Sequence, residues 1–257
     1  MTAEPAPEEP SKELRDYLFN LILYRHSHLI PSFIEQYPGC VNWRLNSDLT
    51  PLMDAVMQDH FEIAEMLLKA GARVNDRTAD NGMTAMYFAG RAPGCIDLLL
   101  QYGADINDKM SNGETALTNA VSNGNTAAAL KLIDRGADIE CLDWAKWTPL
   151  VSAAYHGNAA ICAALLRAGA DMNARGFQGR NALEVAQWGR DNNTWNEEYL
   201  RTLKVLEPAF AAKSQAELQV VLDGIEAEVE QGTDKPVAVC KPLRFKPRSF
   251  YRLFKPV

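Results

Sequence analysis

Cysteine and histidine are the side chains of this sequence that could act as nucleophiles, general bases or metal ligands. The cysteines are Cys40, Cys95, Cys141, Cys162 and Cys240, and the histidines are His26, His28, His60 and His156. The cysteines are odd in number and lack the paired spacing of a zinc site or a disulfide framework. No phosphate-cradling glycine loop, HExxH motif or glycine-flanked serine is present. We therefore expect a protein that is not an enzyme, with no catalytic residues, metal or cofactor.

The charge of the chain is unevenly distributed. Its 257 residues carry a net charge of −7, but the segment from Lys235 onward has seven Lys and Arg and no Asp or Glu. The rest of the chain therefore carries −14. The N-terminal MTAEPAPEEP is acidic, rich in proline and lacks an apolar core, so we expect a disordered leader and not a secretory signal. With its unpaired cysteines, the chain fits a reducing, cytoplasmic compartment.

Two landmarks recur at the same period along the chain. Triplets that begin with Thr or Asn stand at intervals of 31 to 34 residues, each followed three residues later by alanine. They start at Thr50, Thr84, Thr115, Thr148 and Asn181. A Gly-Ala-Asp-hydrophobic-Asn pattern runs in phase with them, from Gly71, Gly103, Gly136 and Gly169. Two independent landmarks at one period indicate internal repeats.

The landmarks predict a pair of helices in each repeat. The threonine is an N-cap, a following proline suits the first helical turn, and the small alanine permits close packing of helices. A second apolar segment with helical spacing ends at the glycine, where the backbone becomes left-handed. One such unit cannot bury its apolar face alone, whereas stacked neighbours can.

The period, the triplets and the Gly-Ala-Asp-hydrophobic-Asn signature resemble the ankyrin repeat family over roughly residues 47 to 207. The resemblance implies an all-α repeat solenoid of stacked helix–turn–helix units with projecting hairpin fingers. We expect helical caps at both ends and an extended basic C-terminal tail. The predicted boundaries are a leader at 1–10, an N-terminal capping unit at 11–46, and repeats at 47–79, 80–111 (irregular), 112–144, 145–177 and 178–210. A C-terminal capping helix at 211–233 and a basic aromatic tail at 234–257 complete the chain.

Two repeats depart from the pattern. The second has one extra residue in its finger and two fewer between its helices, at Ala92-Pro93-Gly94, which predicts a local kink or a shortened helix. The fifth begins with Asn181, and its predicted inter-helix loop, GRDNNTWN, is about seven residues longer than the others.

The family resemblance implies that partners contact the finger tips and the first helices, on a concave face. Repeat three offers small polar residues there, whereas repeats four and five offer aromatic residues and arginine, the types that dominate interface energetics. The candidate partner-binding residues are Trp144, Trp147, Tyr155, His156, Arg175, Phe177, Arg180 and Trp188. The alternative is that these rings pack finger against finger within the stack.

The basic tail is a second candidate site. Its candidate residues are Arg244, Phe245, Arg248, Phe250, Tyr251, Arg252 and Phe254. This segment could fold back on the acidic body, dock on another protein, or bind nucleic acid or anionic membrane. We expect a protein–protein interaction module that acts as a scaffold, adaptor or inhibitor and is a monomer when unbound. The alternative function is a recruiter that binds nucleic acid or membrane through the tail.

Overall fold

The computed structural model describes residues 10–45, 48–192, 197–212 and 215–231. The predicted tail and, apart from Pro10, the predicted leader lie outside these ranges. Contacts divide the chain into two units at Leu222, within the helix α13 (Gln215–Gln231). The first unit contains the repeats, and the described part of the second unit is the remainder of α13.

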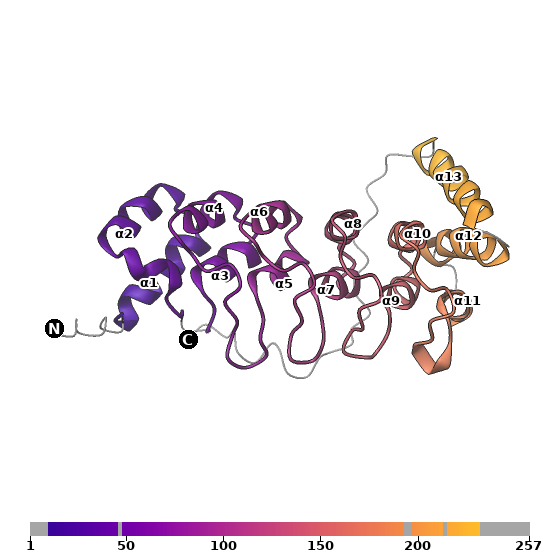
Figure 1. Cartoon of the computed structure of the whole chain (residues 1–257), viewed down its shortest axis with the longest axis horizontal. Coiled ribbons are helices and arrows are strands. Elements are labelled where there is room, and N and C mark those ends of the chain that lie inside the picture. Colours follow the sequence, from indigo (N-terminus) through magenta and orange to yellow (C-terminus); the bar gives the residue numbers. More distant parts are fainter. Residues whose placement is uncertain (1–9, 46–47, 193–196, 213–214, 232–257) are drawn as a thin grey trace. The chain divides into compact units, whose positions relative to one another are not determined.

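The first unit consists of helix pairs that follow one another along the chain (Figure 1). The first helices are α3 (Pro51–Met57), α5 (Ala85–Ala89), α7 (Ala116–Ser122), α9 (Pro149–Tyr155) and α11 (Ala182–Asn192). The second helices are α4 (Phe61–Lys69), α6 (Ile96–Gln101), α8 (Thr126–Asp134), α10 (Ala159–Arg167) and α12 (Glu197–Ala211). Each first helix packs against the next first helix, from α3 through α5, α7 and α9 to α11. The all-α repeat solenoid predicted from the sequence is thus confirmed.

Apolar side chains of these helices are buried in the core of the stack. Leu52, Met86, Leu117 and Leu150 occupy the same place in successive repeats, and each is 2% exposed or less. The repeat alanines Ala55, Ala89, Ala120, Ala153 and Ala186 are fully buried between first helices. Their small side chains allow the close approach that the stack requires.

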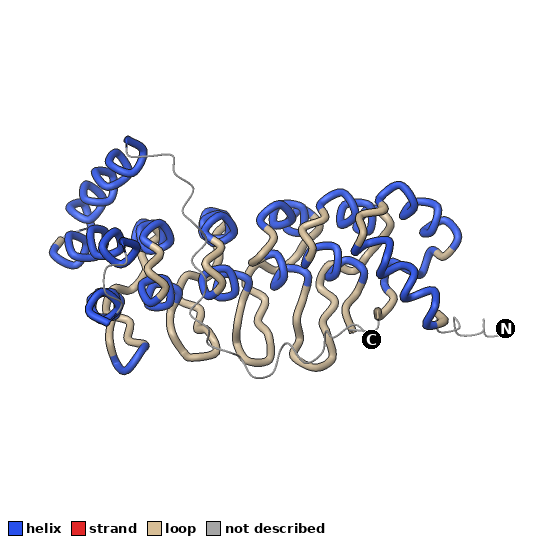
Figure 2. Tube along the Cα trace, turned by 180° about the vertical axis from the view of Figure 1, so that it is seen from behind, coloured by secondary structure: helices blue, strands red, loops and turns tan. Residues whose placement is uncertain are grey.

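The fingers project from one side of the first helices, and the described residues form them without strand segments (Figure 2). A backbone hydrogen bond closes each finger, for example from Asp143 N to Trp147 O at 3.0 Å and from Gly176 N to Arg180 O at 2.9 Å. In repeat two the closing bond joins Thr78 N to Met83 O, one residue further apart. This wider turn accommodates the extra finger residue that the sequence showed.

The helix starts follow the predicted caps in four of five repeats. The hydroxyls of Thr50, Thr84 and Thr115 accept the N–H of the third helical residue. Asn181 does the same, since its Oδ1 accepts from Glu184 N at 2.9 Å while Glu184 Oε2 accepts from Asn181 N. Thr148 is the exception, because its buried hydroxyl has no hydrogen-bond partner within the described residues. Proline at the first position already preorganises that helix.

The asparagines Asn42, Asn75 and Asn107, which end the first signatures, link one unit to the next. Asn75 Nδ2 donates to Gly103 O at 3.0 Å, and its Oδ1 accepts from Asp105 N at 3.4 Å. Asn42, at the end of the capping unit, makes the same pair of bonds to Gly71 O and Arg73 N. The segment before residue 47 therefore continues the repeat register. That unit comprises α1 (Lys12–Leu23), η1 (Ser27–Leu29), α2 (Ile30–Gln36) and η2 (Pro38–Asn42).

Repeat two is shortened, as its sequence predicts. Helix α5 has five residues, where α3, α7 and α9 have seven. A short 3-10 turn, η3 (Pro93–Cys95), leads into α6, which has six residues instead of the nine of α4, α8 and α10. Gly90 allows α5 and α7 to approach closely, because a Cβ there would lie 2.4 Å from Ala116 O.

The predicted long loop of repeat five is partly wrong. Gly189 to Asn192 belong to α11, which runs for eleven residues, and residues 193–196 lie outside the described ranges. The extra residues lengthen the helix, and Gly189 within it lets α12 approach closely, since a Cβ there would lie 2.1 Å from the ring of Tyr199. The capping helix is α13, whose Leu218 and Leu222 are buried. Arg167 Nη2 ties it to α10 by donating to Leu222 O at 2.9 Å.

Candidate functional site

Four aromatic rings meet on the finger side of repeats four and five. Phe177 lies at their centre, with its ring centroid 5.5 Å from Trp147, 5.3 Å from Tyr155 and 4.8 Å from Trp188. Tyr155 and Trp188 stack with their planes 11° apart. All four side chains are half-buried, so each keeps a surface toward solvent. We call Trp147, Tyr155, Phe177 and Trp188 the aromatic cluster.

The repeat period brings these rings together. Tyr155 stands seven residues after Thr148, and Trp188 stands seven residues after Asn181, so the two rings occupy equivalent positions in successive repeats. Phe177 enters from η4 (Phe177–Gly179) at the tip of the next finger. Ring pairs with offset or tilted planes contribute about 0.5–1.5 kcal/mol each beyond the area that they bury.

Trp147 is held both at its backbone and at its ring. The carboxylate of Asp143, which is 3% exposed, accepts from Trp147 N at 3.0 Å and from Ala145 N at 2.8 Å. Burial raises the pKa of Asp143, and these two amide bonds act in the opposite direction. On the far side, a Cβ on Gly176 would lie 3.0 Å from the Trp147 ring and 2.6 Å from Val151. The finger of repeat five therefore rests directly on Trp147.

Trp144 lies outside the aromatic cluster and is 67% exposed. Its equivalent in the next repeat is Phe177, which packs on Trp147 and Tyr155 of the preceding repeat. For Trp144, the corresponding residues of the preceding repeat are Glu114 and Ser122, and neither offers a ring. The preceding repeat therefore offers no aromatic ring on which the finger tip of repeat four could pack, and Trp144 remains in solvent.

Polar candidates surround the aromatic cluster. The Arg180 guanidinium lies 5.8 Å from the Phe177 ring centroid and also bonds to Gln178. Arg175 Nη1 donates to Gly179 O at 2.8 Å and lies 3.4 Å from Glu184 Oε2. His156 is exposed with its ring edge toward Tyr155, and desolvation by neighbouring atoms lowers its pKa. The structure thus gathers the sequence candidates of repeats four and five, with Trp144 apart from the rings.

The sequence of a single repeat does not reveal every residue that shapes this surface. Gly176 and Gly189 are examples, because a side chain of another repeat or helix packs directly against each of them. Tyr199 of α12 donates its hydroxyl to Tyr155 O at 2.7 Å and so supports the end of α9. The tail candidates from Arg244 to Phe254 lie outside the described residues.

The described residues contain no group of three or more His, Cys, Asp and Glu side chains that could hold a metal ion. No helix within the described ranges is long and apolar enough to cross a membrane.

The stacked helix pairs with projecting fingers define a repeat protein, and comparison with known families identifies its family. The family model described as ankyrin repeats (3 copies) matches residues 18–110, 52–143, 83–176 and 120–200. These matches together cover more than half of the chain, and the chain belongs to the ankyrin repeat family. Ankyrin repeats generally mediate protein–protein interactions, and proteins of the family are typically non-catalytic interaction modules.

Curated relatives are similar over part of their length. The ankyrin repeat protein FPV031 of Fowlpox virus is 33% identical over 102 residues, which are 38% of this chain and 30% of the viral protein. Ankyrin repeat protein nuc-2 of Neurospora crassa is 33% identical over 131 residues, 45% of this chain and 12% of nuc-2. The B-cell lymphoma 3 protein homolog of Mus musculus is 36% identical over 102 residues, 37% of this chain and 22% of the relative. The chain spans less than a third of each of these proteins.

Proposed function

We propose that this chain is a non-catalytic scaffold, adaptor or inhibitor that binds a protein partner through the finger side of repeats four and five. The observation that carries the proposal is the half-buried aromatic cluster with the exposed Trp144 beside it. The same face of repeat three has Glu114 and Ser122 at the corresponding positions. The rings of this surface come from two successive repeats, which favours a localised contact with a partner.

Trp144 offers a large contribution to binding. A tryptophan presents about 150–250 Å² to a partner when it is fully covered. Burial of the 67% that is exposed would remove roughly 100–170 Å² from water, a stabilisation of about 2.5–4 kcal/mol. A few such residues account for most of the energy of a typical interface. Ring contacts hold the neighbouring rings in place, so little side-chain entropy is lost when they are covered.

Affinity capture with the intact chain tests the proposal. Proteins captured from a lysate by the wild-type chain are compared, by quantitative mass spectrometry, with those captured by Trp144→Ala and by Trp188→Ala. The matched control is Tyr102→Ala. Tyr102 is the C-cap of α6, one of the second helices, and is 36% exposed. We expect a defined set of proteins that both tryptophan variants lose and the control retains. Equal capture by all variants would place the interaction elsewhere.

The alternative function, recruitment to nucleic acid or anionic membrane, rests on the seven basic residues from Lys235 onward. Binding to single-stranded RNA and to acidic liposomes, with and without residues 236–257, tests it. A tail that instead docks in cis would compete with the protein partner, so its removal would tighten partner binding. We infer a cytoplasmic location, supported by the free thiols of Cys40, Cys95, Cys141 and Cys162.

A further inference from the structure

The second helices of repeats three and four begin with an asparagine cap, but that of repeat one does not. Asn125 Oδ1 accepts from Ala128 N at 3.1 Å, and Asn158 Oδ1 accepts from Ile161 N at 3.1 Å. The equivalent residue of repeat one is His60, and α4 has no side-chain cap. The N–H of Ile63, three residues further on, therefore lacks the side-chain acceptor that its equivalents have.

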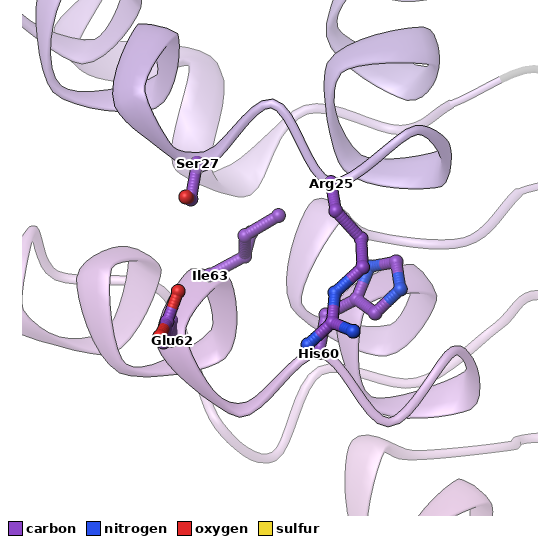
Figure 3. A pocket seen from close by; sticks show the side chains of 5 residues that line it. All are labelled: Arg25, Ser27, His60, Glu62 and Ile63. Atoms are coloured by element: carbon purple, nitrogen blue, oxygen red, sulfur yellow. The ribbon is translucent and has the colours of Figure 1, made fainter.

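A small pocket lies at this uncapped end. Arg25, Ser27, His60, Glu62 and Ile63 line it, and it encloses about 90 Å³. Figure 3 shows the side chains of Arg25 and Ser27 extending from the capping unit toward the start of α4. This volume accommodates one small ion with a few water molecules. The pocket thus lies between the capping unit and the start of α4.

The polar groups of the pocket are only partly satisfied. His60 is 8% exposed, and its Nδ1 is buried with no hydrogen-bond partner within the described residues. Arg25 forms no ion pair with a carboxylate in the described part of the chain, and its backbone is left-handed at φ 56°. Gly124 and Gly157 hold the corresponding left-handed turn position in repeats three and four, and Asp59 holds it in repeat one.

The charged groups at the pocket are of both signs: Arg25 is positive, whereas Asp59 and Glu62 are negative. Burial lowers the pKa of His60, and the positive charge of Arg25 lowers it further, whereas the Ile22 carbonyl and the Asp59 carboxylate act in the opposite direction. The amide end of α4 adds a partial positive charge. Glu62 also lines the pocket, and its carboxylate opposes an anion.

We propose that this pocket binds a small oxyanion of phosphate size. One oxygen replaces the missing asparagine oxygen and accepts from Ile63 N–H, as oxyanions commonly do at helix N-termini. The Arg25 guanidinium supplies the compensating charge and directional donors, and the Ser27 hydroxyl supplies another donor. The site lies on the capping unit and repeat one, so it is independent of the surface proposed for protein binding.

Titration of the isotope-labelled full-length chain with potassium phosphate tests this site, with ionic strength held constant by potassium chloride. We expect saturable shifts of the amide signals of Glu62 and Ile63. Arg25→Gln should weaken binding about tenfold, the effect of one charge-assisted hydrogen bond. Glu62→Gln should tighten it. The control Arg73→Gln removes an arginine whose side chain is 70% exposed and should leave the affinity unchanged.

His60→Asn is the most discriminating variant. An asparagine there would cap Ile63 N–H itself, as Asn125 and Asn158 cap their helices. The variant should therefore fold at least as stably as the wild type and lose phosphate binding. Unchanged phosphate binding in both His60→Asn and Arg25→Gln, or no saturable shift in the wild type, would overturn the proposal. A parallel titration with O-phosphoserine, blocked at its amino and carboxyl groups, distinguishes free phosphate from a phosphorylated side chain as the ligand. If this compound binds as free phosphate does, a phosphoryl group on a side chain also fits the pocket.

Discussion

Replacement of Asp54 by asparagine should stabilise the protein near neutral pH and leave it little changed in acid. Asp54 lies on α3 and is fully buried, and neither carboxylate oxygen has a hydrogen-bond partner of acceptable geometry in the described residues. Burial raises the pKa of Asp54 from 3.8 to about 7, and the nearby Gln58 amide offsets only part of this. The folded state therefore prefers the protonated carboxyl group.

The third repeat shows what this position requires. The residue equivalent to Asp54 is Asn119, which is 5% exposed. Its Nδ2 donates to Tyr87 O of the preceding first helix at 2.9 Å. A protonated Asp54 can donate a hydrogen bond, whereas an ionised one cannot. Asparagine at position 54 supplies a donor at every pH.

The pKa difference sets the magnitude of the effect. Between the unfolded pKa of 3.8 and the folded pKa of about 7, the folded state binds more protons than the unfolded state. Stability must then fall as pH rises through this window and level off above it. Each pKa unit corresponds to about 1.4 kcal/mol, so the wild type loses on the order of 4 kcal/mol by pH ~8. Asp54→Asn should lack this loss.

Urea denaturation followed by far-ultraviolet circular dichroism between pH ~4.5 and ~8.5 measures the difference. The control is Asp134→Asn, because the side chain of Asp134 is 82% exposed, and this variant should follow the wild-type pH profile. If the stability difference between Asp54→Asn and the wild type does not change with pH, Asp54 is ionised in the folded state and the reasoning fails.

Other substitutions distinguish a loss of stability caused by packing from one caused by backbone strain. Gly90→Ala should cost about 1–3 kcal/mol or more, because its Cβ would meet the α7 backbone although φ is helical, at −57°. Gly71→Ala, at φ 90° with no atom within 4 Å, should cost only about 1 kcal/mol from backbone strain; equal melting temperatures would contradict this distinction. Leu150→Ala should cost about 2–5 kcal/mol, since Leu150 is 1% exposed, and a loss typical of surface sites would show that the helix phase is wrong. Trp147→Ala should lower the melting temperature, because three backbone and ring contacts depend on that side chain, whereas Trp144→Ala should leave it unchanged. The reverse order would show that Trp144 is the structural residue.

The sequence by itself predicted the repeat period, the all-α class, the capping residues of the first helices and the glycines that end the second helices. These features depend on interactions within one repeat, such as the Thr115 hydroxyl that caps α7 or the left-handed Gly136 after α8. Local hydrogen bonds and backbone preferences recur in every unit, so a single sequence displays them several times. The missing residues at Ala92-Pro93-Gly94 predicted the shortened helices of repeat two for the same reason.

Only the tertiary structure distinguished residues whose surroundings come from the neighbouring repeat. Trp144 and Trp147 look alike in sequence, but one is exposed and the other is packed, because Gly176 and Phe177 of the next finger cover only Trp147. The burial of Asp54 likewise depends on the capping unit that packs against α3. Contacts between residues about 30 positions apart arise from stacking, and no local pattern of apolar and polar residues encodes which ring meets which.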